Sequence, residues 1–173
     1  FLGDATVNVY PDSRTLAEIA IQTAKVAKRF GVEPKVAMLS FSNFGSSRAQ
    51  RSERVEEAVE IARELDHNLA IDGPMQADTA LVPEVQSEYP FMAFDGPANV
   101  LICPNLASAN IAYKLLEELG DAETTGPILE GLDKPVQLLA RTDQVRDIVN
   151  MAAICALDSI RQESYWSSLV QRE

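Results

Sequence analysis

The stretch A-N-V-L-I-C-P-N-L-A-S-A-N, residues 98–110, decides the fold of this chain. Within it, residues 100–103 form a short apolar run that stops at Pro104, and a polar loop with Asn105 and Asn110 then opens onto an amphipathic stretch. An apolar run of this length is typical of a strand buried on both faces of a parallel sheet. Ligands in such folds bind beyond the carboxyl ends of the strands, so this loop is a candidate binding site.

The sequence pattern predicts that strands and helices alternate along the chain. Further strands are expected at residues 5–10, 35–40 and 68–72, because these runs are short, apolar or alternating, and bounded by turn residues. Helices are expected between the strands and after residue 105. A last helix is expected from Gln144, with an inward face formed by Val145, Ile148, Val149, Ala152, Ala156 and Ile160. This order predicts an α/β fold with a mostly parallel sheet and helices on both faces, a three-layer α/β/α arrangement.

A polar, glycine-bearing joint at residues 118–125 divides the chain into two parts. We expect a main α/β domain at residues 1–125. Residues 126–173 are expected to form a closing segment and a C-terminal helix.

Composition restricts the partners. The 173 residues carry 26 acidic and 15 basic side chains, a formal net charge of −11, which argues against a nucleic-acid partner. No apolar run approaches the roughly 20 residues that span a bilayer, so no membrane association is expected. Cys103 and Cys155 are too few for a disulfide framework and indicate buried thiols in a reducing compartment, hence a cytoplasmic protein.

Common catalytic devices are missing from the sequence. His67 is the only histidine, which excludes a Ser-His-Asp triad within this chain. No glycine-rich nucleotide motif, C-x-x-C or H-E-x-x-H occurs, and we expect no metal site.

One hydroxyl-rich loop has two interpretations. Ser42, Gly45, Ser46 and Ser47 precede a charged helix, whose free backbone N–H groups and positive dipole end favour a phosphate or another anion. Alternatively, Ser46 or Ser47 simply caps the helix.

Two pairs of charged residues also have alternative interpretations. Asp72 and Asp78 are candidate paired carboxylates for acid-base or metal chemistry, but Asp72 also begins an Asp-Gly-Pro sequence that is typical of a plain turn after a strand. Arg141 and Asp147 bracket the start of the last helix. Spacing alone favours a capping role for Asp147 in the first turn of this helix, where its carboxylate would stabilise the helix dipole without any catalytic role.

Taken together, several segments resemble the later half of the phosphotransacetylase family, the phosphate acetyl- and butyryltransferases. The matching segments are K-V-A-M-L-S-F-S-N-F-G-S-S at 35–47, I-D-G-P-M-Q-A-D-T-A-L at 71–81, A-N-V-L-I-C-P-N-L-A-S-A-N-I-A-Y-K at 98–114, G-P-I-L-E-G-L-D-K-P-V at 126–136 and V-R-D-I-V-N-M-A-A-I at 145–154. The resemblance implies a two-domain enzyme fold with coenzyme A and an acyl phosphate in the cleft. It also implies that the first domain comes mostly from sequence before Phe1.

The resemblance also implies a set of site residues. Family enzymes carry a Ser-Arg pair ahead of the last helix and an Asp in its first turn. The Asp takes the coenzyme A thiol proton, and the pair holds the acyl phosphate. Arg141 and Asp147 match this pattern, but the serine position is Ala140. The resemblance places the ligand at Arg141, Asp147 and the loops carrying Ser42, Gly45, Ser46, Ser47, Asn105, Asn110 and Gly126.

Ala140 makes the chain more similar to one branch of the family, the phosphotransacetylase-like C-terminal domain of large bacterial NADP-dependent malic enzymes. This resemblance implies a regulatory and oligomerisation domain that senses acetyl-CoA and lacks transferase activity. NADP, a divalent metal and the oxidation of malate to pyruvate would belong to preceding domains. The alternatives are an active phosphate acetyltransferase and a purely structural dimerisation module.

Overall fold

The computed structural model describes residues 1–46 and 50–170. The chain forms two compact units, Phe1–Leu116 and Glu117–Glu173, which are described separately. The boundary predicted from the sequence, after residue 125, falls inside the second unit.

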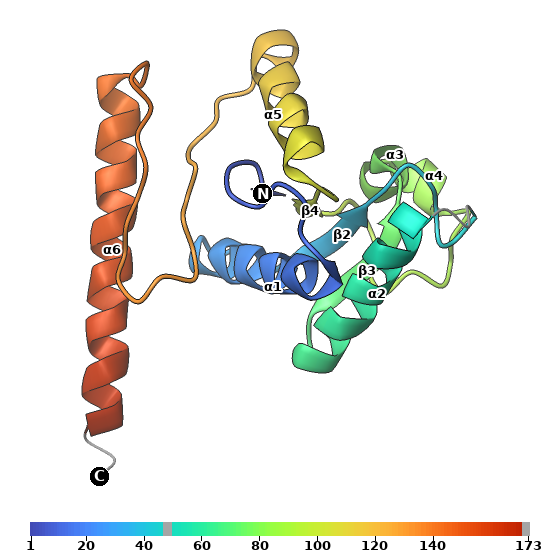
Figure 1. Cartoon of the computed structure of the whole chain (residues 1–173), viewed down its shortest axis with the longest axis horizontal. Coiled ribbons are helices and arrows are strands. Elements are labelled where there is room, and N and C mark those ends of the chain that lie inside the picture. The colour runs from blue at the N-terminus through green and yellow to red at the C-terminus, as the bar shows by residue number, and fades with distance from the viewer. Residues whose placement is uncertain (47–49, 171–173) are drawn as a thin grey trace. The chain divides into compact units, whose positions relative to one another are not determined.

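A four-stranded parallel sheet forms the centre of the first unit (Figure 1). In sheet order the strands are β1 (Leu2–Gly3), β4 (Val100–Ile102), β2 (Lys35–Leu39) and β3 (Ala70–Met75). The apolar strands β2 and β4 pair directly, with Ala37 opposite Leu101. The predicted parallel sheet, and the strand expected at residues 100–103, are therefore confirmed.

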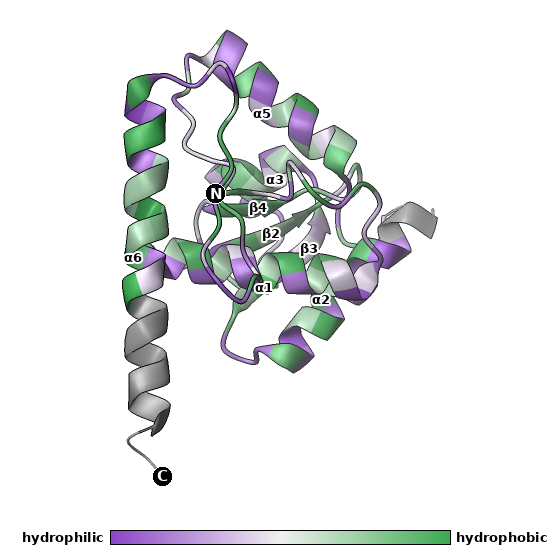
Figure 2. Ribbon diagram, turned by 60° about the vertical axis from the view of Figure 1, so that its left-hand side comes forward, coloured by the Kyte–Doolittle hydropathy of each residue, from purple (hydrophilic) through white to green (hydrophobic). Residues whose placement is uncertain are grey.

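Helices cover both faces of this sheet, which confirms the three-layer arrangement. Two long helices, α1 (Ser13–Arg29) and α2 (Gln50–Leu65), cover one face, and the short helices α3 (Ala77–Leu81) and α4 (Pro83–Gln86) lie toward the other. Along β2, Val36 and Met38 join the core beneath α1 and α2, whereas Ala37 joins the core with Ala80 of α3. Figure 2 shows β2 and β4 as hydrophobic, while α1 and α2 mix hydrophobic and hydrophilic residues.

Local capping explains where α1 begins and ends. The Asp12 side chain accepts a hydrogen bond from the Thr15 backbone N–H at 2.8 Å, which satisfies a donor that the first turn leaves free. The chain leaves the helix through Gly31, whose φ of +77° suits glycine better than any other residue.

Residues 5–10 do not form the predicted strand. They form turns without sheet partners, and the strand at this position is β1, just before them. The Asp4 carboxylate accepts hydrogen bonds from the backbone N–H groups of Thr6, Val7 and Asn8, at 2.8, 3.0 and 2.8 Å. These bonds take the donors that a strand would give to a neighbour, so the local alternation of residue types was misleading.

Asp72, Gly73 and Pro74 do not form the turn favoured by the sequence either. They lie within β3, where the register against β2 shifts: Ala37 pairs with Asp72, but Leu39 pairs with Met75. The extra residue in β3 is a β-bulge, and it reverses the alternation of side chains. Ile71 and Met75 therefore enter cores on opposite faces, although they are four residues apart.

In the second unit, residues 121–144 contain no helix or strand, and α6 spans Val145–Val170. The apolar face predicted to be buried is exposed: Val145, Ile148, Val149, Ala152, Ala156 and Ile160 all face solvent. Met151 and Ile154 are buried instead, at 2% and 9% exposure. The Cys155 thiol, beside them, donates to the Pro135 carbonyl at 3.6 Å, so the extended segment before α6 packs against this other side. The helix α5 (Leu106–Gly120) contains the boundary between the units.

The bulge in β3 predicts a strong preference for glycine at position 73. A Cβ added to Gly73 would lie 2.6 Å from the Met38 carbonyl oxygen, and φ there is +144°. We expect Gly73→Ala to lower the free energy of unfolding by about 3 kcal/mol in urea denaturation. Gly120→Ala is the matched control, because nothing lies within 4 Å of its added Cβ, and its effect should be near zero. Equal effects of the two substitutions would contradict the close approach.

Candidate functional site

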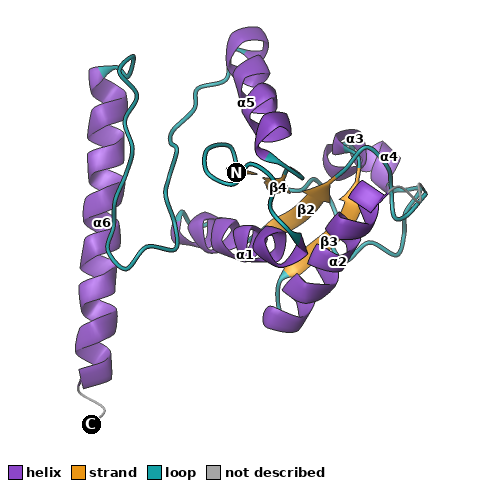
Figure 3. Ribbon diagram, in the orientation of Figure 1, coloured by secondary structure: helices purple, strands orange, loops and turns teal. Residues whose placement is uncertain are grey.

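The candidate site is the edge of the sheet where β2 and β4 end. The two strands are adjacent and parallel, so the loops that follow them leave the sheet on the same side (Figure 3). Residues 40–46 follow β2, and residues 103–105 connect β4 to α5. The sequence predicted ligand-binding residues in both loops.

Two side-chain amides hold the loop after β2 in place. The Asn43 Oδ1 accepts a hydrogen bond from the Gln76 backbone N–H at 2.7 Å, and the Gln76 Nε2 donates to the Phe41 carbonyl at 2.9 Å. The Asn43 Nδ2 also donates to the Tyr89 hydroxyl at 3.1 Å. The sequence did not reveal this pair, because Asn43 and Gln76 are distant in the chain, although both lie in segments that match the family.

The predicted residues of this loop differ in accessibility. Ser42 is buried at 6% exposure, whereas Ser46 is exposed and donates its backbone N–H to the Asn43 carbonyl at 2.9 Å. Gly45 has φ +75°. Ser47 lies outside the described residues, and the first described residue of α2 is Gln50. Anion binding and simple capping by this loop both remain predictions.

In the loop after β4, Asn105 acts as the helix cap of α5. Its Oδ1 accepts a hydrogen bond from the Ser108 backbone N–H at 2.9 Å. The exposed Asn110 donates from Nδ2 to the Ala5 carbonyl at 3.4 Å, which joins α5 to the turn after β1. Both side chains therefore have structural partners, but Asn110 lies inside α5 and not in the loop where the sequence placed it.

Arg54 is a further residue that the sequence did not reveal. From α2 its guanidinium donates to the Pro11 carbonyl at 2.8 Å and to the Pro104 carbonyl at 2.7 Å. It thereby connects the segment before α1 with the loop after β4. In the sequence it is only one of three arginines in the charged helix α2, which does not identify these partners.

Burial and hydrogen bonds act in opposite directions on Asp4. Partial burial opposes ionisation, but the hydrogen bonds from the backbone N–H groups of Thr6, Val7 and Asn8 and from the Asn8 side chain outweigh it. The pKa of the Asp4 carboxyl is therefore lower than usual. The carboxylate is an internal anion that occupies the donors of this turn.

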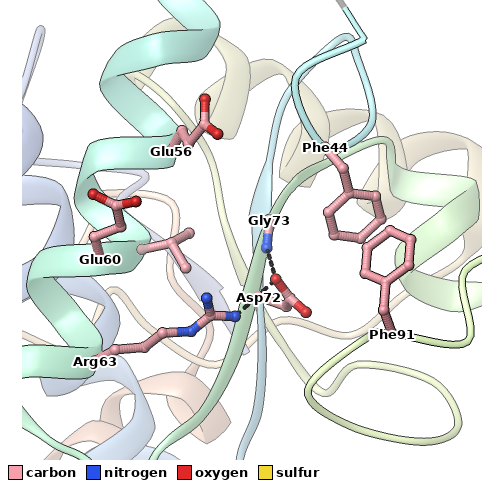
Figure 4. Close-up of a pocket in the computed structure, with 8 residues that line it drawn as sticks. Phe44, Glu56, Glu60, Arg63, Asp72, Gly73 and Phe91 are labelled. Atoms are coloured by element: carbon pink, nitrogen blue, oxygen red, sulfur yellow. Dashed lines mark hydrogen bonds and ion pairs between the residues drawn. The ribbon is translucent and has the colours of Figure 1, made fainter.

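Asp72 and Asp78 do not form a carboxylate pair. Asp72 is buried and bound to Arg63, whose Nη2 lies 2.9 Å from Oδ1 (Figure 4). Asp78 is exposed in α3, where its carboxylate accepts the Thr79 backbone N–H at 2.9 Å. Asp72 therefore has a structural role in β3.

The remaining predicted residues lie in the second unit. Asp147 accepts the Gln144 backbone N–H at 2.9 Å through Oδ2, which is the capping geometry at the start of α6. Ala140 and Arg141 lie in the turn before it, and the Ala140 backbone N–H donates to Asp143 Oδ2 at 2.7 Å. Arg141 is exposed, and among the described residues its side chain has no hydrogen bond or ion pair. Gly126 is exposed in the extended segment, with φ +143°.

The two thiols differ in environment. Cys103 is buried, and this burial raises the pKa of its thiol to about 11, although a hydrogen bond with Ser108 opposes the shift. Cys155 is half-buried. Cys103 is thus an inert thiol at neutral pH.

Within the described part of the chain, no group of three or more His, Cys, Asp or Glu side chains is placed to hold a metal ion. No helix in the same residues has the length and apolarity required to cross a membrane.

The fold and the candidate site are those of a class of α/β domains in which polar loops follow the carboxyl ends of adjacent parallel strands. Comparison with known proteins then identifies the family. The family described as phosphate acetyl/butaryl transferase matches residues 1–156, and the chain belongs to it. The resemblance seen in the sequence is confirmed.

Relatives of two kinds are equally similar in sequence. The phosphate acetyltransferase of Bacillus subtilis (strain 168) is 45% identical over 158 residues, covering 91% of this chain and 49% of the relative. The NADP-dependent malic enzyme of Rhizobium meliloti (strain 1021) is also 45% identical over 158 residues, covering 91% of this chain and 21% of that enzyme. The chain therefore spans about half of the first relative and about a fifth of the second.

A solved structure confirms the fold. The phosphotransacetylase from Streptococcus pyogenes superposes with a TM-score of 0.89 at 45% identity. The match covers 92% of this chain and 49% of that protein.

The environment of Asp4 predicts a specific pH dependence. Because the pKa of Asp4 is lower in the folded chain than in the unfolded one, its carboxylate stabilises the fold at neutral pH. This contribution disappears as the pH falls through the folded pKa. We expect Asp4→Asn to cost about 1 kcal/mol at pH 7, with the difference from the parent chain closing in acid. Urea denaturation across pH measures it.

The control for Asp4 is Asp95→Asn, which removes an exposed carboxylate from the same unit. Its effect should be small at every pH. A constant difference between Asp4→Asn and the parent chain from neutral to acid pH would refute the role of the Asp4 charge.

Proposed function

We propose that this chain is a phosphotransacetylase-like regulatory domain that binds acetyl-CoA and does not transfer acetyl groups. In this proposal it belongs to a cytoplasmic NADP-dependent malic enzyme and helps its subunits associate. Malate oxidation, with NADP and a divalent metal, would take place in other domains of that enzyme. Acetyl-CoA, a product formed downstream of pyruvate, would then adjust the rate by binding one state of the oligomer preferentially.

The observation that carries the proposal is the methyl side chain of Ala140. The family pattern has a serine hydroxyl here, beside the arginine that holds the acyl phosphate. A methyl group can neither donate a hydrogen bond to a phosphate oxygen nor stabilise charge that develops during transfer. Loss of one such donor in other enzymes reduces kcat by about 100-fold or more.

The contacts of Asp147 agree with this proposal. One of its carboxylate oxygens is bonded to the Gln144 backbone N–H, and the other lies 3.8 Å from Arg146. A capping role accounts for an acidic residue at this position without any proton transfer. Arg141, exposed and without an internal ion pair among the described residues, keeps a charge that suits a phosphate group.

One observation favours a second candidate. The Bacillus subtilis phosphate acetyltransferase is as similar to this chain as the Rhizobium meliloti malic enzyme. An active phosphate acetyltransferase that works without the serine is therefore the alternative. A structural dimerisation module without a ligand is the third possibility.

The proposal predicts that acetyl transfer is absent. We expect the intact natural protein that carries this sequence to form no acetyl phosphate from acetyl-CoA and phosphate. It should instead form NADPH from malate at a rate that changes saturably with acetyl-CoA. We expect Ala140→Ser to leave transferase activity undetectable, because one restored hydroxyl does not rebuild a site. Acetyl phosphate formation by the native protein would establish the alternative.

Binding tests the role of Arg141. Replacing it with glutamine should weaken acetyl-CoA binding roughly tenfold in calorimetric titration of the intact protein, through loss of a charge-assisted hydrogen bond. Arg14→Gln is the matched control, since Arg14 is an exposed arginine that forms an ion pair with Glu18 in α1, and it should bind normally. If the native protein shows no heat and no thermal shift at millimolar acetyl-CoA, only the structural role remains.

A further inference from the structure

A pocket of about 260 Å³ lies along the outer edge of β3, and Phe44 of the loop after β2 belongs to its lining. In Figure 4, the side chains of Glu56, Glu60 and Arg63 come from α2 on one side of it. Phe44 and Phe91 stand on the opposite side. The pocket therefore has one charged wall and one aromatic wall.

The charge of this pocket is negative. The positive charge of Arg63 is compensated, because its guanidinium is bound to the buried carboxylate of Asp72 at 2.9 Å. Glu56 and Glu60 are exposed, and within the described residues neither has a hydrogen bond or ion-pair partner. Two uncompensated carboxylates thus remain on the charged wall.

The aromatic wall suits a positive charge. The Phe44 and Phe91 rings meet edge to face, with centroids 4.8 Å apart and planes at 75°, and Tyr89 packs on Phe44 at 5.1 Å. This contact holds the rings in place, and Phe91 stays 65% exposed. The negative face of an aromatic ring attracts cations, most strongly those that shed water easily.

We propose that this pocket binds a small organic cation, a guanidinium or alkylammonium group on a short apolar stem. The stem would contact Val59 and the rings, and the charged head would lie between the rings and the two glutamates. The pocket volume is below that of most drug-sized sites, which fits a small molecule. An anion would meet two like charges, and a bare metal ion would find no ligands on the aromatic wall. The proposal does not depend on acetyl-CoA binding.

The probe for this site is n-butylguanidinium, with n-butylurea as an uncharged molecule of similar shape. In low salt we expect saturable shifts of the amide resonances of Gly73, Phe91 and Ala93, with a Kd on the order of 1 mM. n-Butylurea should cause little change. Equal shifts with both molecules, or no saturation up to about 20 mM n-butylguanidinium, would overturn the proposal.

Matched variants distinguish binding by the charged wall of the pocket from a general effect of surface charge. The double variant Glu56→Gln, Glu60→Gln should bind n-butylguanidinium about fivefold more weakly, because each exposed ion pair contributes modestly. Glu64→Gln removes a similar exposed charge from the same helix, outside the pocket, and should bind as the parent chain does. Phe91→Leu keeps apolar bulk but loses the ring, and binding should weaken about threefold. If Glu64→Gln weakens binding as much as the double variant, the effect is unspecific and the site is disproved.

Discussion

A single buried carboxylate holds the layers of the first unit together at the edge of its sheet. Asp72 accepts hydrogen bonds from Arg63 of α2 at 2.9 Å and from the Gly73 backbone N–H at 2.9 Å through Oδ1. Through Oδ2 it accepts the Ala93 backbone N–H from the segment on the other face at 2.8 Å. A buried charge is costly unless it is paired and hydrogen-bonded, and here each oxygen has a partner. Arg63 also donates to the Ile71 carbonyl at 3.0 Å, so the same pair covers part of an otherwise open strand edge.

The positions of the two loops at the candidate site depend on this edge. Beyond β2 the chain continues alongside β3, with the Ser40 backbone N–H bonded to the Met75 carbonyl and the Phe44 backbone N–H bonded to the Pro74 carbonyl, at 2.8 and 2.7 Å. The loop after β2 is therefore held by a strand that Asp72 fixes. The loop after β4 is fixed from the other direction, by Arg54 at Pro104. Two loops that differ in sequence are thus presented on one rigid support, as is usual where a ligand site is built on an α/β sheet.

The sequence predicted those features that depend on local periodicity. The strands near residues 35–40 and 100–103 and the helix α1 were evident, because burial on two faces or on one face leaves a regular apolar pattern. The strand predicted at residues 5–10 was wrong. Polar and apolar residues do alternate there, but the Asp4 carboxylate accepts the backbone N–H groups that a strand would need. The face of α6 also misled, because an apolar stripe does not specify which segment covers it. Asn43 and Arg54 could not be found, because their partners lie far away in the chain. Among the candidate site residues, Ala140 stood out only against the family pattern.

The bulge in β3 limits where domains of this family can gain or lose residues. Ahead of the bulge, Ile71 faces the core under α1 and α2, and beyond it Met75 faces the opposite core. Removing one residue between them would move the side chain of Met75, and those that follow it in β3, to the opposite face of the sheet. Apolar groups would then lie where polar groups belong. Insertions and deletions should therefore accumulate in surface connections, while the spacing between Ile71 and Met75 stays constant even as the individual side chains drift.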